Sequence, residues 1–343
     1  MNVFCDYHHG GLYKSLKLLF EDRLGWNLYR PIGMDWFHEG YWKLAEPYGN
    51  AIETVSQFLD INHLGFDRMK NLNGNHYVKD EIYYIRDKAE KIYHKAITLE
   101  KFKEMRFDIV ISSYQPHDLL YEDLVKKYQP NAKLIAQIGN IGQSTNIKNI
   151  LSSSLEVFPA ADQNIVYYHQ EFETNVYKYT PPTANKKITS FVNLLPEPQV
   201  FNEYKGLLPE YDFKAFGSTC PDGVLGTPED IAKEMSDSMF GWHIKPGGDG
   251  FGHIIHNWFA CGRPIITEKS HYFGKMAESL MEDGVTCINL EEHNQQENIN
   301  LIKKYSEPEN HIKLCQKAHE RFNEIVNFDE EEKEIKDFLD KLV

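Results

Sequence analysis

The sequence predicts an α/β protein made of two doubly wound domains in tandem. Its 343 residues are about twice the length of a common single domain. Short apolar segments alternate with segments of helical periodicity, a pattern typical of parallel sheets that helices cover on both faces. A segment with two prolines and no apolar periodicity, Tyr179–Asn185, divides the chain, and the alternation restarts after it.

The first half opens with a strand, a glycine turn and a helix. Residues 1–5 are an apolar run, Gly10 and Gly11 follow it, and apolar residues then recur at helical spacing over residues 12–24. Gly25 is expected to end this helix. Further buried strands are expected at residues 108–113, 133–137 and 164–168, with a helix at residues 119–128.

The second half repeats this alternation. Strands are expected at residues 187–193, 212–216, 239–244, 264–267 and 286–290. A helix is expected over residues 228–236 with Thr227 as its N-cap, because a threonine hydroxyl can accept a hydrogen bond from a first-turn N–H group. We therefore expect one domain at residues 1–180, a second at 181–320, and a helical tail at 321–343.

Composition and charge exclude several classes of protein. Apolar residues make up 41% and charged residues 26% of the chain, as in folded globular proteins. No apolar run reaches the roughly 18 residues that span a bilayer, and Asp6 interrupts the apolar start, so we expect neither membrane insertion nor a secretory signal. The five cysteines form no C-x-x-C pair, which favours a reducing cytoplasm. The net charge of −14 disfavours duplex-wide binding of nucleic acid.

Residues 242–266 carry the most specific signal in the chain. Apolar residues recur there at the spacing of a helix packed on a sheet: Ile254, Ile255, Trp258 and Phe259. The opposite face is expected to be polar and exposed, with His253, His256, Asn257 and Ala260. Four glycines precede this helix, at positions 247, 248, 250 and 252. A loop of this composition can approach a ligand closely, because glycine adds no side chain.

The amino end of this helix is suited to a diphosphate. Its first backbone N–H groups have no partner within the helix, and Lys245 supplies a nearby positive charge. Gly262 is expected to cap the helix, and Pro264 begins the next strand.

This segment resembles a motif of GT-B-fold glycosyltransferases of the glycogen-synthase-like group 1 type. In that motif an acid, a Phe-Gly pair, a second acid and an Ala-Cys-Gly-x-Pro run follow one another in order. Asp249 occupies the first acidic position, Phe251-Gly252 the Phe-Gly pair, Asn257 the second acidic position, and residues 260–264 the closing run. The resemblance implies two Rossmann-like domains facing across a cleft, with no required metal and no resident cofactor.

The resemblance also implies transfer of a sugar from a nucleoside-diphosphate sugar to a hydroxyl acceptor, with retention at the anomeric carbon. The acceptor is either a saccharide or a hydroxymethylated base in DNA, of the kind that phage GT-B enzymes glycosylate. The catalytic residues that we predict are Asp249, His9 and His117. The donor-binding residues that we predict are Gly10, Gly11, Lys245, Gly250, Phe251, Gly252, His253 and Asn257.

Two departures from the family pattern keep other interpretations open. Asn257 has no charge, and the loop at residues 193–199 lacks the basic residues that such enzymes carry, so Lys245, Arg263 or Lys269 would have to bind the phosphates. The alternatives are a nucleotide-sugar epimerase and an inactive GT-B binding protein. Asp249 could also be a helix cap, Asn257 a solvated helix residue, and the aromatic residues 36–42 either core or an acceptor-binding surface.

Overall fold

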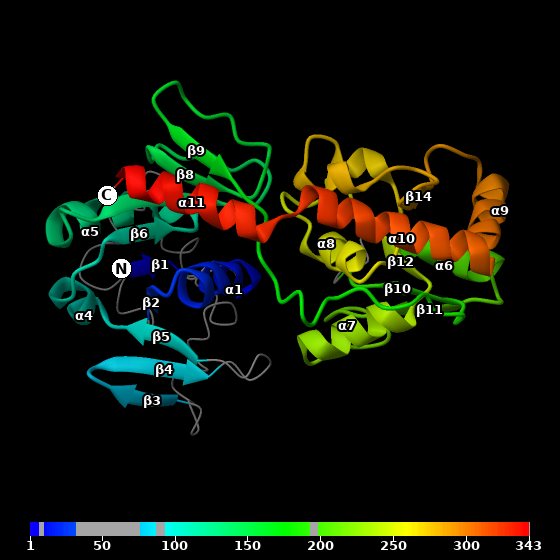
Figure 1. Ribbon diagram of the computed structural model, residues 1–343, viewed down its shortest axis with the longest axis horizontal. Helices are drawn as coiled ribbons and strands as arrows, with labels where there is room; N and C mark the ends of the chain where they lie inside the picture. Colours follow the sequence, from blue (N-terminus) through cyan, green and yellow to red (C-terminus); the bar gives the residue numbers. More distant parts are fainter. Residues whose placement is uncertain (7–9, 32–75, 87–92, 193–197, 343) are drawn as a thin grey trace. The chain divides into compact units, whose positions relative to one another are not determined.

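The computed structural model describes residues 1–6, 10–31, 76–86, 93–192 and 198–342 (Figure 1). These residues form two compact units. The first unit comprises Met1–Phe172 and Phe328–Val343, and the second comprises Glu173–Asn327. The division after Phe172 precedes the boundary that the prolines indicate, and the end of the expected tail belongs to the first unit.

The first unit is built on one mixed sheet. Its described elements are β1 (Asn2–Cys5), α1 (Gly10–Lys17), a π-helical turn (Leu18–Arg23), β2 (Asn27–Pro31), β3 (His76–Lys79), β4 (Ile82–Arg86), β5 (Tyr93–Ile97), α4 (Leu99–Glu104), β6 (Ile109–Ser112), a 3-10 turn (Gln115–His117), α5 (Asp118–Tyr128), β7 (Lys133–Ile138), β8 (Asn149–Ser152), β9 (Asn164–Tyr167) and α11 (Phe328–Leu342). The strand order is β3-β4-β5-β2-β1-β6-β7-β8-β9. β4 pairs antiparallel with β3 and β5, and the remaining pairs are parallel.

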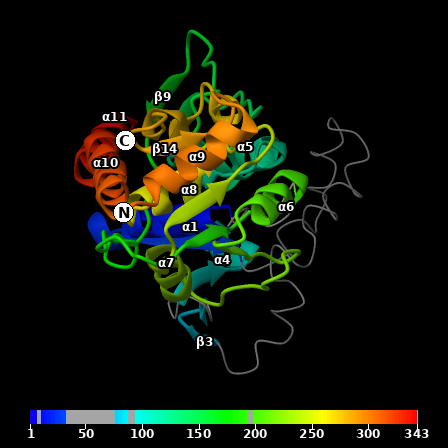
Figure 2. The same cartoon turned by 90° about the vertical axis from the view of Figure 1, so that its right-hand side faces the viewer.

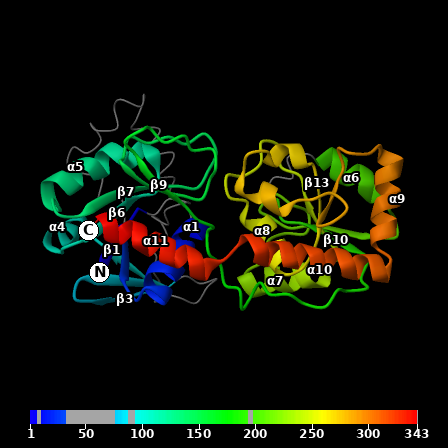
Figure 3. The ribbon, with the colours of Figure 1, turned by 45° about the horizontal axis from the view of Figure 1, so that its top comes forward.

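Alternate residues of β1 enter two hydrophobic cores on opposite faces of this sheet. Phe4 packs against Phe102 of α4 and Tyr121 of α5. Val3 belongs to the other core, to which α1 and the final helix α11 contribute. Ile335 and Leu339 of α11 are buried there, so this helix is an integral layer of the first unit rather than a separate tail (Figure 3).

The second unit is built on a parallel sheet. Its described elements are β10 (Lys187–Ser190), α6 (Pro198–Leu207), β11 (Asp212–Ala215), α7 (Pro228–Asp237), β12 (Phe240–His243), α8 (His253–Ala260), β13 (Ile265–Thr267), two 3-10 turns (Lys269–Tyr272 and Met276–Leu280), β14 (Cys287–Asn289), α9 (Gln295–Tyr305) and α10 (Pro308–Ile325). The strand order is β11-β10-β12-β13-β14, and Figure 2 views this unit from the side of α6 and α9. Thr227 caps α7 as expected, since its hydroxyl accepts a hydrogen bond from the N–H of Asp230.

Helices cover both faces of β12, the central strand of this sheet. The ring of Trp242 packs on one face against Phe201 and Tyr204 of α6. On the other face, Gly241 lies directly against the indole of Trp258 in α8. The expected doubly wound architecture is therefore confirmed in each unit.

The strand order of each sheet reverses at one point. In the first unit this switch point lies between β1 and β6, and in the second between β10 and β12. Open α/β sheets bind ligands outside the carboxyl ends of the strands at such a switch point. The fold therefore directs attention to Asp6 and residues 113–117 in the first unit, and to residues 244–252 in the second.

No helix of the described ranges has the length and apolar character needed to cross a membrane. None of the five cysteines forms a disulfide, and all five are buried.

The close approach of α8 to β12 predicts a specific sensitivity at Gly241. A Cβ atom at this position would lie 2.6 Å from the ring of Trp258, so Gly241→Ala requires the helix to shift. We expect a loss of about 1–3 kcal/mol in the free energy of unfolding, the usual cost of overpacking a core. Gly206→Ala is the matched control, because Gly206 is helical with open space around it and alanine favours helix. Equal stability of the two variants in urea denaturation would contradict this packing.

Candidate functional site

The segment between β12 and α8 requires its glycines. Gly247 and Gly248 have φ angles of +77° and +65°, which disfavour residues that carry a Cβ atom. A Cβ atom on Gly248 would lie only 2.3 Å from the carbonyl oxygen of His271. The N–H of Gly248 donates to the carbonyl oxygen of Lys245 at 2.8 Å, which closes a tight turn. The backbone of this loop therefore rests directly on the segment after β13.

Gly252 begins α8 as its N-cap, with a φ of +83°. A Cβ atom here would lie 3.1 Å from the Cβ of Ala277, so the helix start is also held close to its neighbour. No side chain caps this helix, and its first turn has no acidic residue. The interpretation of Asp249 as a capping carboxylate is therefore wrong. The unfilled cap and the helix dipole together favour a bound anion at this end.

Lys245 and Asp249, both predicted site residues, form an ion pair with each other across this loop. Their side chains are 40% and 32% exposed, respectively. An ammonium group in this position can contact a phosphate, and the carboxylate can accept hydrogen bonds from sugar hydroxyls. The loop thus brings a cation, an acid and the start of a helix to one edge of the sheet.

The polar face that we expected on α8 is wrong for three of its residues, since His256, Asn257 and Ala260 are buried. The imidazole of His256 is covered by the ring of Phe251, with the two ring centroids 4.1 Å apart. Its Nδ1 lies 2.9 Å from the carbonyl oxygen of Gly252. The predicted site residue His253 is half-buried, with its ring edge-on to Phe251 at 5.0 Å.

Asn257 is buried and keeps an unsatisfied acceptor. Its side-chain Oδ1 has no hydrogen-bond partner within the described ranges of the chain. A buried amide oxygen without a partner is costly, because it has lost its hydration. A ligand hydroxyl that donates to Oδ1 would remove this cost, so Asn257 is suited to bind a hydroxyl group.

Two further residues at this edge carry buried polar atoms, and neither was among the predicted site residues. His243 ends β12, and Tyr272 lies after β13, with ring centroids 5.9 Å apart. Three polar atoms have no hydrogen-bond partner among the residues described: both imidazole nitrogens of His243 and the hydroxyl of Tyr272. Burial lowers the pKa of His243 to about 4, so the ring is neutral at pH 7. The position of His243 at the end of an expected strand is the one feature that could have drawn notice to it, and Tyr272 has no such feature.

Arg263, considered above as a phosphate ligand, is instead a buried structural residue. Its guanidinium donates to the carbonyl oxygens of Ser236 and Ser238 at the end of α7, of Thr180 and Pro181, and of Cys261 and Gly262 at the end of α8. It also donates to the Thr180 hydroxyl. Since all of its N–H groups are directed at the protein, Arg263 cannot serve a diphosphate.

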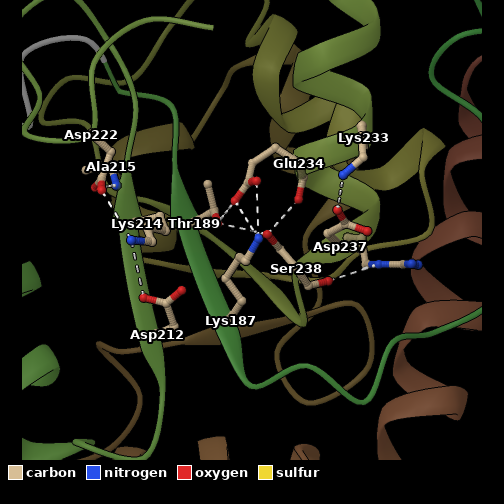
Figure 4. Close-up of polar contacts among 11 residues, drawn as sticks. Lys187, Thr189, Asp212, Lys214, Ala215, Asp222, Lys233, Glu234, Asp237 and Ser238 are labelled. Atoms are coloured by element: carbon tan, nitrogen blue, oxygen red, sulfur yellow. Dashed lines mark hydrogen bonds and ion pairs between the residues drawn. The ribbon is translucent and has the colours of Figure 1, made fainter.

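Ser238 extends this network to β10. Its hydroxyl donates to the carbonyl oxygen of Glu234 and lies 2.8 Å from the hydroxyl of Thr189. The Glu234 carboxylate in turn contacts Thr189 and Lys187, which lie on β10 (Figure 4). α7 is thereby fixed to the strand that flanks the switch point.

In the first unit, Gly10 and Gly11 begin α1 instead of forming a turn before it. They lie at the carboxyl end of β1 and therefore at the switch point. His117 lies at the same edge, buried at the start of α5, with its Nδ1 2.7 Å from Asp6 Oδ2. His9, the aromatic residues 36–42 and most of the loop at 193–199 lie outside the described residues. Within the described ranges, no cluster of three or more His, Cys, Asp or Glu residues could hold a metal ion.

The role of Arg263 can be tested by substitution. Arg263→Lys offers three donors to seven acceptors, so buried carbonyl oxygens lose their partners. We expect the free energy of unfolding to fall by about 3 kcal/mol or more. Arg321→Lys is the matched control, because Arg321 forms a partly exposed ion pair with Glu282. Unchanged stability of Arg263→Lys in urea denaturation, together with weaker binding of a nucleoside diphosphate, would contradict the structural role.

The comparison with known proteins agrees with this architecture. No protein-family model and no curated protein sequence matches the chain. Among solved structures, HepE from Anabaena in complex with UDP-glucose superimposes with a TM-score of 0.63 at 13% identity, over 100% of each chain. A glycosyltransferase from Rickettsia africae gives 0.61 at 12% identity, over 99% of this chain and 98% of the other.

A third similar structure is an alpha-glucosyltransferase in complex with UDP and a 13-mer DNA containing a hydroxymethyluracil base (HMU). Its TM-score is 0.61 at 11% identity, over 98% of each chain. Similarity that extends over the whole chain, with two parallel-sheet units of the topology described above, shows that this protein has the GT-B fold.

Proposed function

We propose that this protein is a glycosyltransferase that transfers a sugar from a nucleoside-diphosphate sugar to a hydroxyl acceptor. The observation that carries the proposal is the loop at residues 244–252, which joins the switch-point strand β12 to an uncapped helix and presents Lys245 and Asp249 together. Structures of similar fold contain UDP or UDP-glucose, which makes a UDP-sugar the first donor to test.

In the proposed mechanism, the backbone of Gly250, Phe251 and Gly252 and the ammonium group of Lys245 bind the diphosphate. Stabilising the negative charge of the departing nucleoside diphosphate lowers the barrier, because helix N–H groups and a fixed cation need no reorganisation. Asp249 accepts hydrogen bonds from the donor sugar, which orients the anomeric carbon. No metal and no resident cofactor enters this mechanism; the nucleotide sugar is a co-substrate.

The remaining predicted residues complete the site. The unsatisfied Oδ1 of Asn257 accepts a hydrogen bond from the ribose, so the missing charge at this position weakens that contact without abolishing it. His253 contributes to donor binding at the first turn of α8. In the first unit, Gly10 and Gly11 supply N–H groups at the start of α1, and His117 contacts a sugar hydroxyl or acts as an acid-base group. His9, which lies outside the described residues, stays a predicted catalytic residue.

The proposal predicts different effects for the two members of the ion pair, Lys245 and Asp249. Lys245→Ala should weaken UDP binding at least tenfold, because a charge-assisted hydrogen bond contributes about 1.5–3 kcal/mol. Asp249→Ala should not weaken UDP binding, because it removes a negative charge near the diphosphate. Turnover of UDP-glucose by this variant should fall at least tenfold. Calorimetry with UDP and assay of UDP release measure the two effects.

Lys233 and Asp237 provide a matched control, because they form an exposed i,i+4 ion pair on α7, which precedes β12, whereas the loop follows the carboxyl end of that strand. Alanine at either position should change neither binding nor turnover. Wild-type turnover by both Lys245→Ala and Asp249→Ala would exclude the proposed site. Binding of UDP-glucose without turnover would favour the binding-protein alternative, and an epimerised nucleotide sugar would favour the epimerase.

The acceptor and the stereochemistry are part of the same proposal. A saccharide and duplex DNA with hydroxymethylated bases are the two acceptors to compare, and a DNA base would have to leave the helix stack before it could react. Retention means that the product has the anomeric configuration of the donor. Proton NMR of the product measures this configuration, and an inverted product would contradict retention.

A further inference from the structure

The switch point of the first unit contains a buried carboxylate–imidazole pair, Asp6 and His117. The proposed function assigns a role to His117 but none to Asp6. Asp6 follows β1 directly, and His117 ends the 3-10 turn after β6. β1 and β6 are adjacent parallel strands, so the two residues meet across the point where the strand order reverses. Asp6 is 4% exposed and His117 is 7% exposed.

The backbone of Asp6 is held on both sides by groups from the β6 segment. Its N–H donates to the carbonyl oxygen of Ile111 at 3.0 Å, and its carbonyl oxygen accepts a hydrogen bond from the Ser113 hydroxyl at 2.9 Å. These two hydrogen bonds fix the backbone from which the carboxylate extends. Its Oδ2 lies 2.7 Å from Nδ1 of His117. A short contact between two buried groups on anchored segments defines the orientation of the imidazole ring.

The groups around this pair are aromatic or hydrogen-bonded to neutral partners. Tyr114 and Tyr121 present their rings to His117 at centroid distances of 4.9 and 6.4 Å. Burial, and then the Asp6 carboxylate, raises the pKa of Tyr114 to about 12 and that of Tyr121 well above its usual value. Asp118 accepts hydrogen bonds from the hydroxyls of Ser112 and Thr145, and burial raises its pKa to about 6.

We propose that Asp6 is a positioning residue: its carboxylate holds a proton on Nδ1 of His117, and it thereby turns Nε2 toward a substrate hydroxyl. A carboxylate that binds one ring nitrogen selects the tautomer in which that nitrogen carries the proton. Nε2 is then the hydrogen-bond acceptor of the neutral ring. The inference rests on the proposed function, because it requires a substrate at this edge of the first unit.

The test is a double-mutant cycle on the full-length chain, with UDP-glucose as the probe and UDP release as the readout. Asp6→Asn and His117→Gln should each lower turnover at least tenfold, and the double variant should be no slower than His117→Gln alone, because Asp6 acts through the ring. The affinity of Asp6→Asn for UDP should equal that of the wild type. Asp108→Asn is the matched control, since Asp108 precedes β6 and its carboxylate binds the N–H of Asn2 at the opposite edge of these strands.

A second measurement does not depend on the Asp6 variant. In the ¹⁵N-histidine NMR spectrum of the wild type, with His117→Gln for assignment, the neutral ring should carry its proton on Nδ1. A proton on Nε2, wild-type turnover by Asp6→Asn, or losses that multiply in the double variant would overturn the inference while the proposed function stands. A wild type that neither binds nor turns over the nucleotide sugar would overturn the proposed function, and this inference with it.

Discussion

The second unit depends on the burial of one positive charge, the guanidinium of Arg263. Removing such a charge from water is costly unless protein groups replace its hydration, and here carbonyl and hydroxyl oxygens do so. Several of these carbonyls end α7 and α8, where helix dipoles favour a cation. Because the carboxyl end of α8 is fixed in this way, and Gly241 fixes its middle against β12, the amino end of α8 has a defined place at the switch point.

The two units share one structural feature. In each of them, a parallel sheet brings loops that are distant in sequence to one edge, and backbone contacts then hold the loops in place. In the second unit the contact between Gly248 and the carbonyl of His271 leaves no space for a side chain. In the first unit, hydrogen bonds on both sides of Asp6 perform this role. The proposed chemistry therefore relies on groups whose positions are determined before a substrate binds.

Sequence patterns predicted β1, β6, β7 and β9, all five strands of the second unit, several helices and the Lys245–Asp249 loop, because apolar runs and glycines report burial and backbone conformation directly. These patterns failed where tertiary contacts determine which side chains are buried and what they bind. His256, on the expected polar face of α8, is buried and stacked on Phe251, and Arg263 donates to carbonyl oxygens that no local pattern encodes. The hairpin β3–β4 and the interior strands β2, β5 and β8 were also missed. His243 is buried at a strand end, where a lone histidine gives no signal.

The central claim is that the start of α8 binds the diphosphate of a nucleotide sugar. A crystal structure of the protein with UDP tests it most directly. We predict that the phosphate oxygens lie within hydrogen-bond distance of the backbone N–H groups of residues 250–252, with the Lys245 ammonium in contact and the ribose beside Asn257. Electron density for UDP elsewhere, with residues 244–252 unchanged and empty, would contradict the account.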